Sequence, residues 1–107
     1  MVDATVIDAV KRYLAALPGY GIHASRAILY GSFVQGENHG WSDIDLIVVA
    51  GEFDAPHDMA LVERLWLATE ASDDRIEPIA CGEREWLEDD VRPILEIARR
   101  EGVEITA

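Results

Sequence analysis

Apolar residues recur along the chain with two different periodicities, and the changes between them predict alternating helices and strands. Over residues 3–17 they recur every three to four positions, which is typical of an amphipathic helix that Pro and Gly at 18–19 would end. A short apolar run at 27–30 predicts a buried strand, and the stretch over 42–50, hydrophilic only at its start and rich in β-branched residues, predicts a second central strand. The glycine-containing stretch over 32–41 predicts a loop between them, with one short helical turn near its start.

The second half of the chain continues this alternation. The predicted elements are a turn over 51–56, a helix over 58–69, a strand over 75–81, a short acidic helical turn over 83–89, a helix from 90 to Gly102 and an edge strand over 103–105. The second and third strands are joined through a helix, which favours parallel neighbours or a mixed sheet with helices on one face. We therefore predict an α/β (α+β) fold, a small mixed β-sheet backed by helices, in one domain over residues 1–107.

Charge and length narrow the function. The 107 residues include 21 acidic and 9 basic ones, and the formal net charge is −12. This balance argues against direct binding to nucleic acid or to an anionic membrane, since both need a basic surface. The single cysteine, the absence of a signal-peptide pattern and the absence of a spanning apolar run favour a cytoplasmic location. So short a chain leaves little room for a second substrate-binding domain, and we expect it to work with another chain.

Three carboxylates are the first candidates for chemistry. Asp43 and Asp45 lie two residues apart at the start of the second predicted strand, so their side chains emerge on the same face. Two adjacent carboxylates repel each other unless the site is solvated or occupied by cations, and Mg²⁺ prefers oxygen ligands of this kind. Glu77, on the third predicted strand, joins them if the two strands are neighbours. A surface of this composition suits a two-metal site for displacement at phosphorus.

A second candidate motif precedes the carboxylates. Gly31 and Ser32 end the first predicted strand, where glycine lets the backbone approach a phosphate and the serine hydroxyl and nearby amides donate hydrogen bonds to it. The joint pattern is Gly31-Ser32, ten residues, Asp43-x-Asp45, and later Glu77.

This joint pattern resembles the signature of the polymerase β-like nucleotidyltransferase superfamily. The apolar flanks at 28–30 and 46–49 are similar to those of its small stand-alone members, the minimal nucleotidyltransferases (MNT). The resemblance runs over nearly the whole chain, from the first helix to the closing 101–105. It implies the polymerase β-like nucleotidyltransferase fold.

The resemblance also implies roles for the candidate residues. Asp43 and Asp45 would hold two Mg²⁺ ions, and Glu77 would complete the triad and help to activate the attacking hydroxyl. Gly31 and Ser32 would hold the triphosphate. The reaction would be the attack of an acceptor hydroxyl on the α-phosphorus of ATP, with release of pyrophosphate. Minimal members are often paired with a HEPN ribonuclease toxin, which they silence as antitoxins by transferring AMP to a tyrosine, so a hetero-oligomer with a HEPN-type protein is expected.

The sequence departs from the family pattern at two places. Many relatives carry an arginine or lysine in the loop after Gly-Ser, whereas this chain has Gln35, which can hydrogen-bond to a nucleotide but cannot neutralise it. No basic residue lies between residues 31 and 50, so a phosphate-binding cation would come from Arg26, Arg64, Arg75 or a partner chain. The third carboxylate is Glu77, where many relatives have aspartate.

Two alternatives stay open beside AMP transfer to a protein partner. One is an antitoxin that acts by complex formation without catalysis, since the loop cation is missing. The other is a small-molecule nucleotidyltransferase that resembles the aminoglycoside-modifying enzymes and takes its acceptor pocket from a partner chain. A neighbouring gene for a HEPN protein would favour the protein-directed readings, and its absence would favour the small-molecule one.

Overall fold

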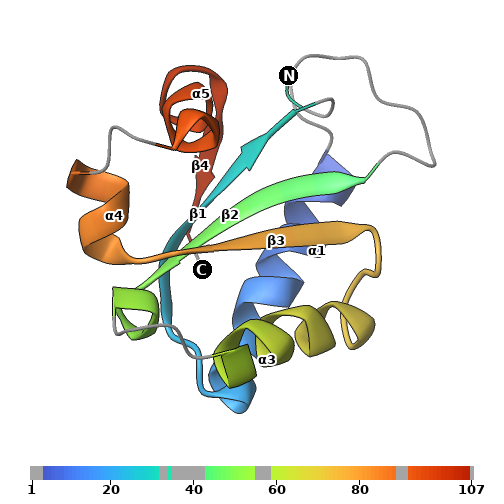
Figure 1. The fold of residues 1–107 in the computed structure, drawn as a ribbon. Coiled ribbons are helices and arrows are strands. Elements are labelled where there is room, and N and C mark those ends of the chain that lie inside the picture. Colours follow the sequence, from blue (N-terminus) through green and yellow to red (C-terminus); the bar gives the residue numbers. More distant parts are fainter. Residues whose placement is uncertain (1–3, 32–33, 35–42, 55–58, 89–91, 107) are drawn as a thin grey trace.

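In the part of the chain that the structure describes, four strands form one mixed sheet in the order β3-β2-β1-β4 (Figure 1). The structure is a computed structural model that describes residues 4–31, 34, 43–54, 59–88 and 92–106. The strands are β1 (Ala24–Tyr30), β2 (Ile44–Ala50), β3 (Ile76–Cys81) and β4 (Val103–Ile105). The helices are α1 (Ala4–Ala16), α3 (Met59–Glu70), α4 (Glu83–Glu88) and α5 (Pro93–Glu101), with 3₁₀ turns over Leu17–Tyr20 and Gly51–Asp54.

Strand β2 is an interior strand of the sheet and pairs with two different neighbours. It runs antiparallel to β1 and parallel to β3, and β4 pairs antiparallel with the other edge of β1. The connection from β2 to β3 passes through α3, as a parallel pair requires. The predicted mixed sheet and the parallel placement of the second and third strands are therefore confirmed.

The sheet has helices on both faces, which corrects the expectation of one covered face and one open face. Helices α1 and α3 pack on one face, around a cluster that includes Leu29 and Leu46 (Figure 1). On the other face, α5 places Leu95 and Ala98 against Ile28 and the neighbouring strand residues. The almost continuous apolar sequence of β2 is the physical reason, since a strand buried on both faces has no polar alternation.

The two helices on the first face are fixed to one another. The Tyr13 hydroxyl on α1 donates a hydrogen bond of 2.7 Å to the Leu65 carbonyl oxygen on α3, and both side chains are fully buried. A buried hydroxyl needs such a partner, because an unpaired polar group in the core costs stability. This contact holds α3 in place beside β3, with which it also packs.

Element boundaries differ from the prediction where the sequence carries little apolar signal. Strand β1 begins at Ala24, three residues before the predicted apolar run, and the first helix continues past Ala16 as a 3₁₀ turn through Pro18. Of the helical turn predicted near the start of the 32–41 loop, only Val34 is among the described residues, and it is helical.

In the described part of the chain, no helix has the length and apolar character that crossing a bilayer requires.

Candidate active site

The register of the sheet brings the predicted carboxylates together. Asp45 on β2 and Glu77 on β3 are paired directly across the parallel ladder. Their side chains share one face, because paired residues of adjacent strands point to the same side. Asp43 comes immediately before β2 and is exposed. All three lie at the end of the sheet where β2 and β3 begin, on the face that also carries α5.

Mutual repulsion and burial raise the pKa of two of these groups. Burial raises the pKa of Asp45 above its ordinary value, and the neighbouring charge of Asp43 raises it further. For Glu77, burial again has the largest effect on the pKa, followed by the charge of Asp43, a side-chain hydrogen bond to Asp43 and the charge of Asp45. The cluster therefore holds its negative charge at a cost, which a bound cation would relieve.

Gly31 directly follows β1 and lies against the Asp45 carboxylate of this cluster. Its backbone has a φ of +81°, a conformation that residues with a side chain rarely adopt. A Cβ added here would clash with Oδ2 of Asp45. The sequence predicted a glycine that lets a phosphate approach, and the structure shows a further reason for it: the Asp45 carboxylate occupies the space of a side chain at this position.

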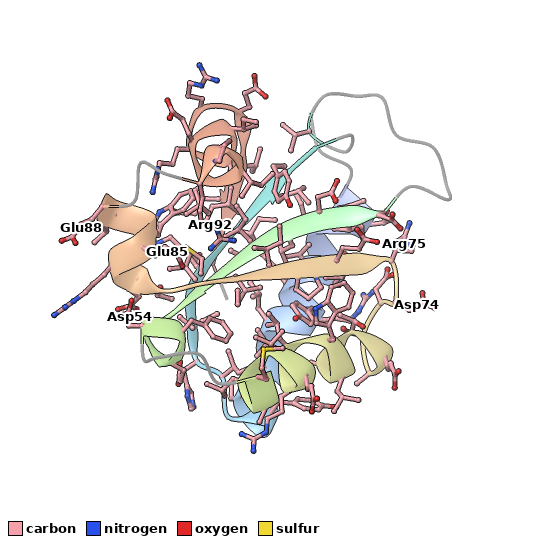
Figure 2. The ribbon with its side chains drawn as sticks, viewed as in Figure 1. Asp54, Asp74, Arg75, Glu85, Glu88 and Arg92 are labelled. Atoms are coloured by element: carbon pink, nitrogen blue, oxygen red, sulfur yellow. The ribbon has the colours of Figure 1, made fainter. Side chains whose placement is uncertain are left out.

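Two groups that the sequence reasoning missed border the cluster. Tyr30 is the antiparallel partner of Asp45, and burial together with the charges of Asp45 and Glu77 raises the pKa of its phenol to about 12, so it stays neutral. The charge of Arg92 lowers the pKa of Tyr30, against these effects. Arg92 also forms an ion pair of 2.7 Å with Glu85, between α4 and α5 (Figure 2). In the sequence Tyr30 belongs to an apolar run, so nothing marked it as a site residue. Its position directly before Gly31 is the feature that could have indicated it.

One of the candidate cations lies at the same end of the sheet. The Ile44 N–H next to Asp43 donates a hydrogen bond of 2.8 Å to the carbonyl oxygen of Arg75, which precedes β3 (Figure 2). The Arg75 guanidinium is held by Asp73 through two hydrogen bonds, 3.1 Å to Oδ1 and 2.8 Å to Oδ2. This pairing lowers the pKa of Asp73.

The other two candidate arginines are placed differently. Arg26 pairs with Glu104 at 3.1 Å, in the half of β1 away from the carboxylates. Arg64 lies on α3, with its guanidinium 3.6 Å from the position of a Cβ on Gly21. Of the three arginines that the sequence offered, Arg75 is the one that the sheet places beside Asp43.

Not every predicted site residue is described. Ser32 and Gln35 lie outside the described residues, so their nucleotide-binding role stays a prediction. Among the residues that are described, no three His, Cys, Asp or Glu side chains are arranged as a group that could hold a metal ion. The chemistry of the donors nevertheless fits Mg²⁺, because Asp43, Asp45 and Glu77 are oxygen ligands whose mutual repulsion a divalent cation would relieve.

The raised pKa of Asp45 predicts that this carboxylate destabilises the metal-free protein. The pKa of Asp45 is higher in the folded than in the unfolded state. The resulting loss of folding stability is therefore absent at pH values below the unfolded-state pKa and complete at pH values above the folded-state pKa. We expect Asp45→Asn to raise the melting temperature in EDTA at pH 7, because the substitution removes a charge that the folded protein holds at a cost. The gain should vanish near pH 3, as measured by differential scanning calorimetry, and a destabilised variant at pH 7 would contradict the assignment.

Comparison with known proteins identifies the fold and the family. The crystal structure of a Sulfolobus solfataricus protein, provisionally identified as a nucleotidyltransferase, superposes with a TM-score of 0.60 at 16% sequence identity, over 94% of this chain and 78% of that one. At this identity the likeness shows a shared fold. No curated protein matches the chain. The family model for the nucleotidyltransferase domain matches residues 7–105, which carry the paired carboxylates of β2 and β3, and the chain belongs to that family.

Proposed function

We propose that this nucleotidyltransferase-domain protein transfers AMP from ATP to a hydroxyl of a protein partner, as the antitoxin of a HEPN-type ribonuclease toxin. The observation that supports the chemistry is the meeting of Asp43, Asp45 and Glu77 at one end of the sheet, beside the left-handed backbone of Gly31. Asp43, Asp45 and Glu77 would hold two Mg²⁺ ions. When bound, these ions would neutralise charge on the triphosphate and on the attacking oxygen.

The residues of the chain have separate roles in this reaction. Gly31, Ser32 and Gln35 bind the triphosphate, and Arg75 supplies the positive charge that the loop lacks. Glu77 accepts the proton of the acceptor hydroxyl as its oxygen forms a bond to the α-phosphorus. The bond between the α-phosphorus and the bridging oxygen breaks, and pyrophosphate leaves with the electron pair. The neutral Tyr30 phenol adds no further negative charge next to Asp45, its partner across the strand pair.

A protein acceptor is supported by the surface of the molecule. The chain carries a net charge of −12 and exposes large apolar side chains, among them Met59, Trp66 and Leu67. Exposed apolar groups on a strongly charged surface are typical of a site that another protein covers. Two hollows, of about 450 and 570 Å³, run along α3 and the outer edge of β3, and Asp43, Asp45 and Glu77 line neither of them. Among the described residues, neither of these two hollows adjoins the carboxylates, and this supports an acceptor that another macromolecule presents.

The decisive experiment follows the mass of the partner. The chain is incubated with a HEPN protein encoded beside it, ATP and Mg²⁺, and the intact mass of the partner is recorded. We expect a gain in AMP units that disappears with Asp43→Ala/Asp45→Ala. If this double variant still neutralises the toxin fully and no mass gain is ever detected, the protein acts by binding alone. A gain on an aminoglycoside and none on protein would favour the small-molecule reading.

The placement of Arg75 predicts a selective effect on ATP binding. Asp73 fixes the Arg75 guanidinium through Nε and one terminal nitrogen, and the N–H groups of the other terminal nitrogen are the donors proposed to bind a phosphate. We expect Arg75→Gln to raise the KM for ATP about tenfold with kcat little changed, as loss of one charge-assisted contact would. The matched control is Arg26→Gln, which removes an arginine that pairs with Glu104. An unchanged KM in Arg75→Gln would assign the phosphate-binding cation to another residue or to the partner.

A further inference from the structure

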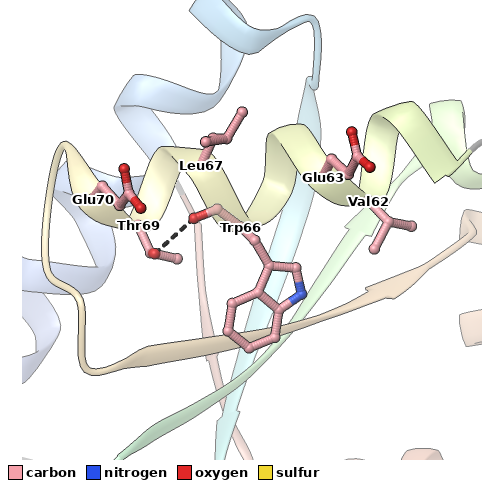
Figure 3. Close-up of a pocket in the computed structure, with 6 residues that line it drawn as sticks. All are labelled: Val62, Glu63, Trp66, Leu67, Thr69 and Glu70. Atoms are coloured by element: carbon pink, nitrogen blue, oxygen red, sulfur yellow. Dashed lines mark hydrogen bonds between the residues drawn. The ribbon is translucent and has the colours of Figure 1, made fainter.

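An apolar surface runs along α3 and onto the free edge of the sheet. On α3, Met59, Val62 and Trp66 follow at helical spacing, and Met59 and Trp66 are 65% and 46% exposed. Figure 3 shows the Trp66 indole and Val62 on the same side of the helix. Val62 lines both the hollow of about 450 Å³ along α3 and the hollow of about 570 Å³ that reaches β3. We call these three residues, together with Pro78, Ile79 and Ala80 of β3, the α3–β3 surface.

The core does not require the exposed side chains of this surface. The residues of α3 that are fully buried, Leu65 and Ala68, face the sheet and lie on a different side of the helix. An exposed tryptophan beside an exposed methionine is costly in water, and such side chains are common anchors of protein interfaces. Their exposure makes this side of α3 a candidate protein interface.

Unpaired acidic groups border the same surface. Glu63 and Glu70 line the hollow around Trp66, and neither forms an ion pair with another residue in the described ranges (Figure 3). In the second hollow, Glu52 is held by His23 at 2.9 Å. Arg92, the one basic group among the described residues that line this hollow, is paired with Glu85. The border is thus negative, with Glu63 and Glu70 available to a basic partner.

This negative border argues against a second copy of the same chain. In a symmetric dimer through this surface, Glu63 and Glu70 would face the same residues of the partner copy, or residues of a molecule that also carries a charge of −12. Like charges placed together across an interface cost free energy. The electrostatics instead favour a partner whose apolar anchor is flanked by lysine or arginine.

The edge of β3 restricts the conformation of that partner. Ile76, Pro78 and Ala80 direct their backbone groups away from β2, since the intervening residues make the parallel ladder. The Ile76 N–H is bonded to the Asp73 carbonyl oxygen at 3.2 Å, and Pro78 has no N–H. Ala80 is left as the outward donor of this strand. An added strand would find too few hydrogen bonds, so the partner must bind through side chains, as an amphipathic helix does.

We propose that the α3–β3 surface docks an amphipathic helix of a protein partner, with apolar residues around Trp66 and Met59 and basic residues opposite Glu63 and Glu70. The proposal rests on the proposed function, since this helix belongs to the protein that receives AMP. The surface includes the edge strand that also carries Glu77, although Pro78 and Glu77 face opposite sides of the sheet, so a helix bound there holds the partner protein at the edge next to the carboxylates. The surface thereby selects the acceptor.

A pair of synthetic helical peptides tests the surface without any assumption about catalysis. Both carry the same leucine and tryptophan face, one flanked by lysine and arginine and the other by glutamate, and binding is measured by fluorescence anisotropy. We expect the basic peptide to bind at least about tenfold more tightly at low salt, with a ratio that shrinks as salt is added. Trp66→Ser/Met59→Ser should weaken binding at least about tenfold. Glu63→Lys/Glu70→Lys should reverse the preference between the peptides.

Leu87→Ser is the matched control, because Leu87 is 75% exposed on α4 and lies outside the surface. It should leave binding of both peptides unchanged. Equal affinity for the two peptides, or undiminished binding by Trp66→Ser/Met59→Ser, overturns the proposal. So does a dimer in sedimentation velocity that the same double variant dissociates, because the occupant is then a second copy.

Kinetics with the acceptor protein separate this proposal from the proposed function. Trp66→Ser should raise the KM for the acceptor at least about tenfold and leave the KM for ATP unchanged, whereas Asp43→Asn should bind the acceptor normally without modifying it. Peptide discrimination without any AMP transfer supports the surface and rejects the function. AMP transfer with an unchanged acceptor KM in Trp66→Ser supports the function and rejects the surface.

Discussion

Replacing either aspartate of the pair by asparagine should lower the rate of AMP transfer about 10³-fold. The substitution keeps the size of the side chain but removes one negative charge from the proposed Mg²⁺ site, and several kcal/mol of transition-state stabilisation depend on that site. Asp43 and Asp45 act on the same ions, so Asp43→Asn/Asp45→Asn should be little slower than either single variant. The measurement is the initial rate of AMP incorporation into the purified partner at saturating ATP.

The control for this series is Asp8→Asn, on the exposed side of α1, which removes the same charge outside the site. It should keep the full rate. Melting temperatures should show that the slow variants are folded, with Asp45→Asn somewhat more stable than the natural chain in EDTA. Two single variants that each retain more than a tenth of the rate would show that these carboxylates do not hold the catalytic ions.

Gly31→Ala should disable the enzyme through the backbone. The left-handed conformation at φ +81° costs an alanine about 1–2 kcal/mol, and the new methyl group would also occupy the space of the Asp45 carboxylate. Asp45 would have to move, and a misplaced catalytic group costs about 10²-fold in rate. We therefore expect kcat to fall at least about 10²-fold, together with a loss of thermal stability measured by calorimetry.

Gly19→Ala is the matched control for this substitution. Gly19 has no atom within 4 Å of the position of an added Cβ, and its φ is not positive. The thermal stability of the Gly19→Ala variant should differ little from that of the natural chain. A Gly31→Ala variant as active as the natural chain would mean that the Asp45 carboxylate can turn away from β1 without harm to the reaction.

The fold could be predicted from sequence to the extent that apolar runs are continuous. Strand β2 is apolar from Leu46 to Ala50, and the helix that connects it to β3 favoured the parallel pairing that the structure shows. The first residues of β1 escaped prediction because Ala24, Ser25 and Arg26 carry no apolar pattern. They become a strand through pairing with β2, which a local pattern does not record.

The sequence predicted which residues belong to the candidate site, but it did not predict how most of them are arranged. The spacing of Asp43 and Asp45 already placed both carboxylates on one face, because side chains alternate along a strand. The sequence does not show that Tyr30 stands opposite Asp45, since that depends on the antiparallel register of β1 and β2. The position of Arg75 beside Asp43 depends likewise on the β2–β3 ladder.

The pairing of Asp45 with Glu77 also limits how the chain can change in length. Side chains alternate between the two faces, so one residue inserted within β3 ahead of Glu77 would turn its carboxylate towards α1 and α3, into the apolar core. Two inserted residues would restore the face but shift the pairing by about 7 Å along β2. Insertions in the turn between α3 and β3 leave the ladder intact. Related chains should therefore vary in length in that turn and keep a fixed count of residues within β2 and β3.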